Sequence, residues 1–283
     1  MHRPWGLIMS SEQLEITCLD SLEKAIEALS LAFDREKMWW RGHADALNWD
    51  LKPSIFRPKR NGQPYKEVAL INQFQMRAFG RLGHRPRPCS ELEWLFLAQH
   101  YMLPTRLLDW TESPLVALYF AVCEENCQGK LADCDACLWA IAPSKFNEAN
   151  SNKTDPANAQ KGLISPENSV VQAMAMQAFG WKNEAIWSRT GQNPYALPQI
   201  VALETFEIDE RIVAQSGRFT LHSCEQAIES LDDKDQYLRN FRIPSGSKPT
   251  IRQRLKDLGI QRWSIFPDLQ ALALGLKDHE FTS

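Results

Sequence analysis

The segment from Ala98 to Val122 limits what this chain can fold into more than any other stretch. It reads AQHYMLPTRLLDWTESPLVALYFAV, so charged and polar side chains stand directly beside leucines and then run into an apolar helix. Charged side chains are rarely buried in full unless they are paired. Arg106 and Asp109 therefore predict one of two features at this place, a buried polar brace or a ligand site.

Composition excludes several classes of protein. With 283 residues, of which 44% are hydrophobic, the chain is long and apolar enough for one large domain or two smaller ones. The formal net charge of −3 argues against a surface that is positive overall and would attract nucleic acid for that reason. No apolar run reaches the ~18 residues of a membrane span, and we expect a cytoplasmic protein without a signal peptide. Motifs for a serine hydrolase elbow, a P-loop or a glycine-rich dinucleotide loop do not occur.

The cysteines do not suggest a secreted disulfide framework, because there are seven of them at uneven spacing. Cys123, Cys127, Cys134 and Cys137 cluster closely enough to suggest a tetrathiolate zinc site. The short central loop and the place of the first two at the end of an apolar helix favour small buried side chains instead. We therefore expect no metal.

Periodicity and chain breakers predict the elements of the first half. A short strand over 15–20 leads to Ser21 as a helix N-cap, and a second strand ends at Gly42. The further predictions are helices over 65–82 and 91–100, a strand over 105–109, and a helix over 115–122 with Pro114 in its first turn.

The second half continues with intermingled strands and helices. Residues 147–162 lack periodicity and are rich in Asn, Ala, Asp and Lys, which predicts a mobile surface insertion. The other predictions are strands over 136–142, near 195–203, from Arg218 and from Phe241, and helices over 170–178, from Ser223 or Cys224, over 248–258 before Gly259, and after 264. Since regular βαβ alternation is missing, we expect a single α+β domain over 13–276, with a flexible leader at 1–12 and a tail at 277–283.

Three blocks of sequence resemble the FRG domain family. The first is WWRGHADALNWDLKPSIFR, in which an aromatic residue, Arg and Gly precede a turn that ends in Arg. The second is the segment from Ala98 to Val122, which is the most diagnostic. The third is RIVAQSGRFTLH followed by SIFPDLQAL. The likeness covers residues 13–275, with Trp40 where the family name has Phe and Met102 where many members carry Gly.

The order of features also resembles the ADP-ribosyltransferase fold. That fold has an early strand bearing Arg or His, a strand with Ser or Thr before an apolar helix, and a late acidic or amide group. The resemblance implies an α+β fold with a central mixed or antiparallel split sheet flanked by helices, and NAD as co-substrate. The enzyme would orient NAD and stabilise an oxocarbenium-like species.

The resemblance assigns roles to particular residues. Arg41 would hold a phosphate or the ribose through its planar fork, and Thr111 and Ser113 would position the nicotinamide ribose. Glu210 is the candidate for the late carboxylate, and Gln215 is the alternative. The candidate cofactor-binding residues are Gln99, His100, Thr105, Arg106, Asp109, Trp110, Thr111, Ser113 and Arg211.

Several of these residues also have a purely structural interpretation. Arg41 would form a buried ion pair with Asp109. His100 would end a helix and bond a carbonyl group, rather than act as a general base. Trp110 would pack in the core with its N–H satisfied, rather than provide a stacking platform for nicotinamide or adenine. Both interpretations remain open from the sequence.

These features predict an NAD-binding ADP-ribosyltransferase-like enzyme that modifies a protein or a nucleic acid. Such an activity would suit a toxin or a phage-defence effector, with an inhibitory partner in the case of a toxin. One alternative is a non-catalytic module that senses nucleotides or mediates interactions. Another is an RNA-binding or RNA-processing protein, for which the only footprint is a basic helix face of Arg77, Arg81, Arg85 and Arg87.

Overall fold

The computed structural model describes residues 15–83, 86–123, 131–151, 162–207 and 210–277. The chain separates into two compact units, each assembled from distant stretches of sequence. Unit 1 comprises 1–49, 111–142 and 235–283, and unit 2 comprises 50–110 and 143–234.

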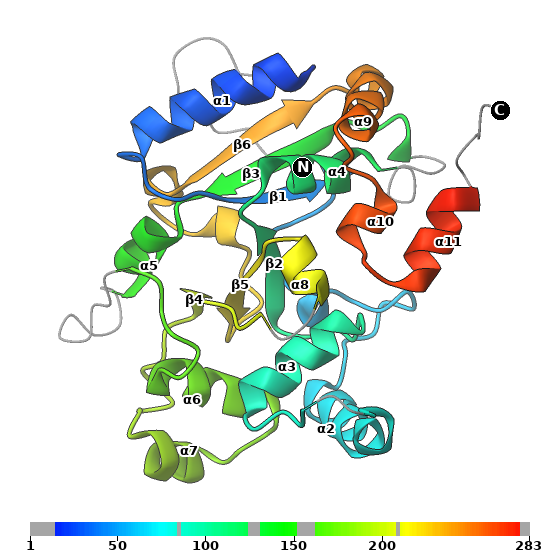
Figure 1. The fold of residues 1–283 in the computed structure, drawn as a ribbon. Coiled ribbons are helices and arrows are strands. Elements are labelled where there is room, and N and C mark those ends of the chain that lie inside the picture. The colour runs from blue at the N-terminus through cyan, green and yellow to red at the C-terminus, as the bar shows by residue number, and fades with distance from the viewer. Residues whose placement is uncertain (1–14, 84–85, 124–130, 152–161, 208–209, 278–283) are drawn as a thin grey trace. The chain divides into compact units, whose positions relative to one another are not determined.

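Unit 1 is an antiparallel sheet with helices packed on it (Figure 1). Its elements are α1 (Leu19–Ala32), β1 (Trp39–His43), α4 (Pro114–Val122), β3 (Ala136–Ile141), β6 (Leu238–Ile243), η8 (Ser245–Ser247), α9 (Lys248–Asp257), α10 (Arg262–Ile265) and α11 (Leu269–Lys277). Strand β3 lies between β1 and β6, with Trp139 opposite Arg41 on one side and Asn240 on the other.

The apolar core of unit 1 lies on one face of this sheet. Trp40, Leu138 and Phe241 join side chains of α1, α4 and α9 in one buried cluster. Helix α4 approaches β1 closely because Gly42 has no side chain. An added Cβ there would lie 1.9 Å from the carbonyl oxygen of Ala117.

Unit 2 combines short strands with a larger set of helices. Its elements are η1 (Ser54–Phe56), α2 (Glu67–Ala78), η2 (Phe79–Arg81), α3 (Glu91–His100), α5 (Pro143–Ser151), α6 (Ser169–Ala178), α7 (Asn183–Thr190), β4 (Ile200–Leu203), α8 (Glu210–Ala214), β5 (Gly217–His222) and η6 (Ile228–Ser230). The short helix η7 (Lys234–Gln236) contains the division between the units.

Strand β2 (Leu107–Thr111) also contains the division. Its first four residues belong to unit 2, where β2 neighbours β5 and β5 pairs antiparallel with β4. Its last residue, Thr111, belongs to unit 1 and pairs with Trp40 of β1. The segment from Ala98 to Val122 therefore contributes to both units.

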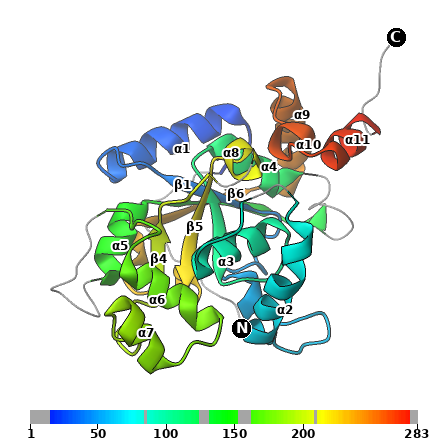
Figure 2. The ribbon, with the colours of Figure 1, turned by 60° about the horizontal axis from the view of Figure 1, so that its bottom comes forward.

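The core of unit 2 forms between its strands and helices α3 and α6, which lie beside β5 in Figure 2. Phe96 of α3 contacts Phe219 of β5 with ring centroids 5.1 Å apart. Helix α3 begins after Ser90, whose Oγ accepts a hydrogen bond from the N–H of Glu93. This cap and the following apolar run explain why α3 occupies the predicted residues 91–100.

Several sequence predictions are confirmed. The class is α+β and the paired strands of each unit are antiparallel. Pro114 is the first residue of α4, and Gly259 adopts a φ of 78° just beyond α9.

The strand predicted over 15–20 is wrong. Helix α1 begins at Leu19 with Cys18 as its N-cap, so Ser21 lies within the first turn. Its Oγ accepts hydrogen bonds from the N–H groups of Thr17 and Cys18, and this local bonding favours a helix start over a strand. The helix expected from Ser223 or Cys224 is also wrong, since the next helical turn is η6.

The mobile insertion predicted over 147–162 is wrong where the structure describes it. Residues 147–151 belong to α5, and Asn147 is only 2% exposed. Its amide bonds the N–H and carbonyl of Ala202 in β4 and the carbonyl of Gly162. The rest of the predicted insertion, 152–161, lies outside the described residues.

The described helices include none that is long and apolar enough to cross a membrane. Within the described ranges, no group of three or more His, Cys, Asp or Glu side chains is placed to hold a metal ion. Cys127, which belongs to the cysteine cluster, lies outside them.

Candidate functional site

Strand β2 carries one carboxylate among buried neighbours. Leu108 and Trp110 are buried on either side of Asp109, which is exposed. Alternation along a strand places Asp109 on the face opposite to Leu108 and Trp110, but on the same face as Leu107 and Thr111, which are buried as well. Alternation alone therefore does not explain an exposed acidic side chain at this position.

Asp109 is oriented by a chain of hydrogen bonds within unit 2. The Nε2 of Gln99, near the end of α3, donates to Oδ2 of Asp109 at 2.8 Å. The Oε1 of Gln99 accepts from the hydroxyl of Thr105 at 2.6 Å, and that hydroxyl accepts from the N–H of Leu107. Because Thr105 is buried, the amide of Gln99 is held in one orientation.

Arg57 adjoins this network and was missed at the level of sequence. It directly follows η1, and the N–H of Ile55 in η1 donates to the carbonyl of Thr105 at 3.2 Å. Burial lowers the pKa of Arg57, while the negative charges of Asp50, Asp109 and Glu229 raise it. The available signal was its position as the last residue of the first family block, WWRGHADALNWDLKPSIFR.

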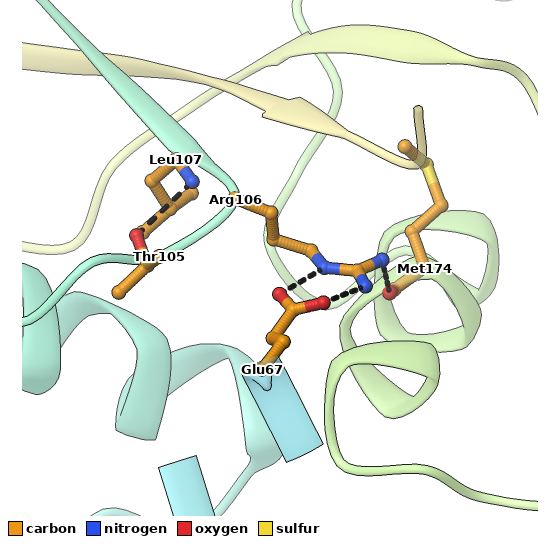
Figure 3. Close-up of polar contacts among 5 residues, drawn as sticks. All are labelled: Glu67, Thr105, Arg106, Leu107 and Met174. Atoms are coloured by element: carbon orange, nitrogen blue, oxygen red, sulfur yellow. Dashed lines mark hydrogen bonds and ion pairs between the residues drawn. The ribbon is translucent and has the colours of Figure 1, made fainter. Parts of the chain in front are cut away.

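Arg106 forms a closed brace instead (Figure 3). Its Nε and Nη2 donate to the two carboxylate oxygens of Glu67 in α2, at 2.8 and 2.6 Å. Its Nη1 donates to the carbonyl of Met174 in α6 at 3.3 Å. The side chain of Arg106 is only 7% exposed, so all three donor positions are used inside the protein. Of the two features that the sequence predicted, Arg106 forms the buried brace.

Trp110 is a core residue with a satisfied indole. Its Nε1 donates to the hydroxyl of Thr220 at 3.2 Å, and this hydroxyl lies 3.0 Å from Nε2 of His222. All three side chains are buried. The structural interpretation of Trp110 therefore fits the geometry, and a stacking platform does not.

The late candidates lie on and beside the short helix α8. Glu210 is its first residue and is exposed, and Gln215 follows its last residue. Arg211 donates from Nη1 to the carbonyl of His100 at the end of α3, at 3.2 Å. The ring of His100 lies edge-on to Tyr101, with centroids 4.7 Å apart. These contacts fasten α8 to α3 but do not connect Glu210 to the network around Asp109.

Three candidates belong to unit 1. Arg41 of β1 donates from Nε to Nε2 of His43 at 3.0 Å. Ser113 is the N-cap of α4, since its Oγ accepts from the N–H of Val116, and its own N–H donates to Oγ1 of Thr111. Arg41 belongs to unit 1 and Asp109 to unit 2, and each unit is described by itself. The expected ion pair of Arg41 and Asp109 therefore stays a prediction.

The basic face proposed for RNA lies on α2 and η2. Arg77 bonds Gln73 through its side chain, and Arg81 donates to the carbonyl of Arg77. Arg87 lies over the ring of Phe79 at 5.4 Å, and Arg85 lies outside the described residues. The described members bond their own helix or a neighbouring ring, which is typical of a solvated face.

Comparison with known proteins identifies one family. Residues 36–130 match the model of the FRG domain. The match includes Arg41, Arg57, Gln99 and Asp109, and it confirms the resemblance found in the first two sequence blocks. No curated protein and no solved structure matches the chain.

Proposed function

The chain carries an FRG domain at residues 36–130, and from this premise we propose that it is an NAD-binding, ADP-ribosyltransferase-like enzyme. It would transfer ADP-ribose to a protein or nucleic-acid acceptor. One observation supports this proposal above others. Asp109 presents a carboxylate to solvent from a strand whose other residues are buried, and Gln99 fixes the orientation of that carboxylate.

A fixed carboxylate suits the chemistry of glycosidic cleavage. When the bond between nicotinamide and ribose breaks, positive charge develops on the ribose, and a carboxylate held nearby stabilises it. Asp109 meets this need better than Glu210, because no described residue orients the exposed side chain of Glu210. Pre-oriented charge is more effective than a mobile one, since it needs no reorganisation during the reaction.

Two readouts test the activity. Purified protein is incubated with labelled NAD and a cell lysate, and both the transfer of label and the release of nicotinamide are measured. We expect transfer by the natural chain and a loss of about 10²-fold or more in Asp109→Asn. Glu225→Gln removes an exposed carboxylate of unit 2 outside the network, and it should leave the rate unchanged.

The other outcomes separate the alternatives. If Glu210→Gln abolishes transfer while Asp109→Asn does not, the carboxylate is misassigned. If NAD raises the melting temperature without release of nicotinamide, the chain is a nucleotide-sensing module. Absence of both label and nicotinamide in every lysate fraction overturns the enzyme proposal.

A further inference from the structure

The stretch 51–90 of unit 2 carries a strong positive charge that the composition of the whole chain conceals. Nine of its side chains are Lys or Arg and only one, Glu67, is acidic, whereas the chain as a whole has a net charge of −3. The carboxylate of Glu67 is already bound by Arg106 inside the unit. A positive field is therefore local to this stretch, although the protein as a whole is slightly acidic.

Part of this charge gathers along α2 and η2. Lys66 is the N-cap of α2, and Arg77 follows it by eleven residues, which is about three turns, so the two lie on one line along the helix. Ala78 faces inward and packs with Trp94 of α3, the helix beside α2 in Figure 2. Arg81 of η2 donates from Nη1 to the carbonyl of Arg77, and all three basic side chains are exposed. Lys66, Arg77 and Arg81 thus form a basic stripe on unit 2.

An aromatic ring lies at one end of the basic stripe. Phe79 of η2 is 44% exposed, and the guanidinium carbon of Arg87 lies 5.4 Å from the centroid of its ring. Proteins that bind single-stranded nucleic acid combine positive side chains for the phosphates with aromatic rings on which bases stack. The stripe brings these two features together.

The basic stripe is kept without neutralising carboxylates. Arg77 and Arg81 are four residues apart, and like charges at this spacing disfavour a helix. No described carboxylate pairs with either of them, and the sequence from 68 to 90 contains no acidic residue. The next carboxylates are used elsewhere, since Glu91 pairs with Arg189 of α7 and Glu93 accepts from the N–H of Cys89. A solvated face explains single arginines, but not the absence of acidic residues over such a length.

We propose that the basic stripe, together with Phe79, binds single-stranded nucleic acid. Resting on the proposed function, this nucleic acid is the acceptor of ADP-ribose. Guanidinium groups bind phosphate oxygens in pairs, and phosphates follow one another every ~3.4 Å along a strand. Lys66 and Arg77 are about 16 Å apart along the axis of α2, a length that several successive phosphates cover. An acidic protein would satisfy the charges, but it offers no base for the exposed ring.

Binding is measured by fluorescence anisotropy on the full chain. The probe is a fluorescein-labelled single strand of about 16 nucleotides and mixed sequence, made as RNA and as DNA. We expect an affinity that falls as salt is added, because phosphate contacts release counterions. Arg77→Gln with Arg81→Gln should weaken binding by about tenfold at low salt. It should also reduce the slope of log K against log salt by about 1.4, since each phosphate contact contributes about 0.7.

Two further double variants locate the contact. Arg77→Lys with Arg81→Lys keeps the charge and should keep the salt slope, which a merely structural role would not predict. Arg254→Gln with Lys256→Gln removes the same charge from exposed positions of α9 in unit 1, and it should leave the affinity nearly unchanged. If the α9 variant weakens binding as much, net charge governs binding and the stripe is overturned. If the double Gln variant of the stripe does not fold, Arg77→Gln alone decides, with a slope lower by about 0.7.

Polyglutamate tests an acidic protein as the occupant. This polymer carries negative charge without phosphates or bases, so it should displace the labelled strand poorly. Displacement as effective, charge for charge, as that by the unlabelled strand overturns the assignment to nucleic acid. Absence of binding by both the RNA and the DNA strand overturns the stripe as well.

The basic stripe and the proposed activity fail in different ways. Binding that is lost in the double Gln variant, without release of nicotinamide from NAD, supports the stripe and removes the activity. Transfer of label to protein alone, with no binding of either strand, supports the activity and overturns the stripe. Label on nucleic acid that disappears in Arg77→Gln with Arg81→Gln supports both.

Discussion

Arg106 and Arg57 are two arginines of one unit whose guanidinium groups are used in opposite ways. Arg106 is nearly buried, and its three donor positions bond Glu67 and Met174. Arg57 bonds two backbone carbonyls and has a further donor that no described residue accepts. A buried guanidinium whose three nitrogens all donate within the protein serves stability, whereas one with a nitrogen that bonds no described residue is suited to a ligand. Buried, bonded side chains should therefore cost the most stability when they are removed, and exposed ones the least.

Loss of the Arg106 brace should have the largest effect. Arg106→Ala leaves the carboxylate of Glu67 without its buried partner, which we expect to lower the free energy of unfolding by about 3–5 kcal/mol. Urea denaturation followed by circular dichroism measures it. Arg60→Ala is the matched control, because Arg60 is exposed and its removal should change stability by no more than about 0.5 kcal/mol. A larger loss of unfolding free energy in Arg57→Ala than in Arg106→Ala would contradict this contrast between the two arginines.

Asn147 should come next, as a buried side chain that bonds backbone. Asn147→Ala leaves the N–H and carbonyl of Ala202 without their side-chain partner, at a cost of about 1–3 kcal/mol. Asn150 is the control, because among the described residues its amide bonds only the carbonyl of Phe146, one turn earlier in the same helix. The same denaturation measurement should give a smaller loss for Asn150→Ala. Equal losses would mean that the bonds from α5 to β4 add nothing to stability.

The partly exposed ion pair of Arg242 with Asp135, in unit 1, provides an intermediate case. The side chains of Arg242 and Asp135 are 39% and 31% exposed, against 7% and 17% for Arg106 and Glu67. Solvent screens such a pair, so Arg242→Ala should cost no more than about 1 kcal/mol. A loss as large as that of Arg106→Ala would show that exposure does not separate the pairs.

The same pair has a pH dependence of defined sign. Burial acts to raise the pKa of Asp135, but the N–H of Ser245 and the guanidinium of Arg242 together lower it. A carboxyl group with a lowered pKa in the folded state stabilises fully above its unfolded pKa of about 3.9. That stabilisation is lost as the pH falls through the lowered value. Denaturation curves at several acidic pH values should therefore show a shallower dependence in Arg242→Ala.

Local signals in the sequence were enough to place many elements. The apolar periodicity over 91–100 predicted α3, and Pro114 predicted the start of α4. Strand 15–20 failed because Ser21 bonds back to the N–H groups before the helix, a contact that alternation of apolar residues does not reveal. The prediction of a mobile insertion was wrong over 147–151 because polar composition does not reveal that one of these side chains, Asn147, is buried.

The site was predictable only in part, for a physical reason. Gln99, Thr105 and Asp109 lie within one short segment, so the sequence could propose them together. Arg57 joins them through a backbone hydrogen bond between Ile55 and Thr105, which depends on the fold and leaves no periodic pattern. The distinction between the closed brace of Arg106 and the open network likewise depends on partners far away in sequence.

The smallest effect on stability is expected at Asp109, and it gives the sharpest test of this contrast. Asp109 is exposed, and its amide counterpart in Asp109→Asn has nearly the same shape, so the free energy of unfolding should change by no more than about 0.5 kcal/mol. The rate of ADP-ribose transfer should nevertheless fall by about 10²-fold or more, because a neutral amide stabilises developing positive charge less than a carboxylate does. Both quantities are measured on one preparation, by urea denaturation and by release of nicotinamide from NAD. Arg106→Ala should show the reverse ranking, with a large loss of stability and, at temperatures where it remains folded, an unchanged rate of transfer. If Asp109→Asn instead unfolds the chain, the carboxylate belongs with the brace, and the two arginines no longer mark two separate functions.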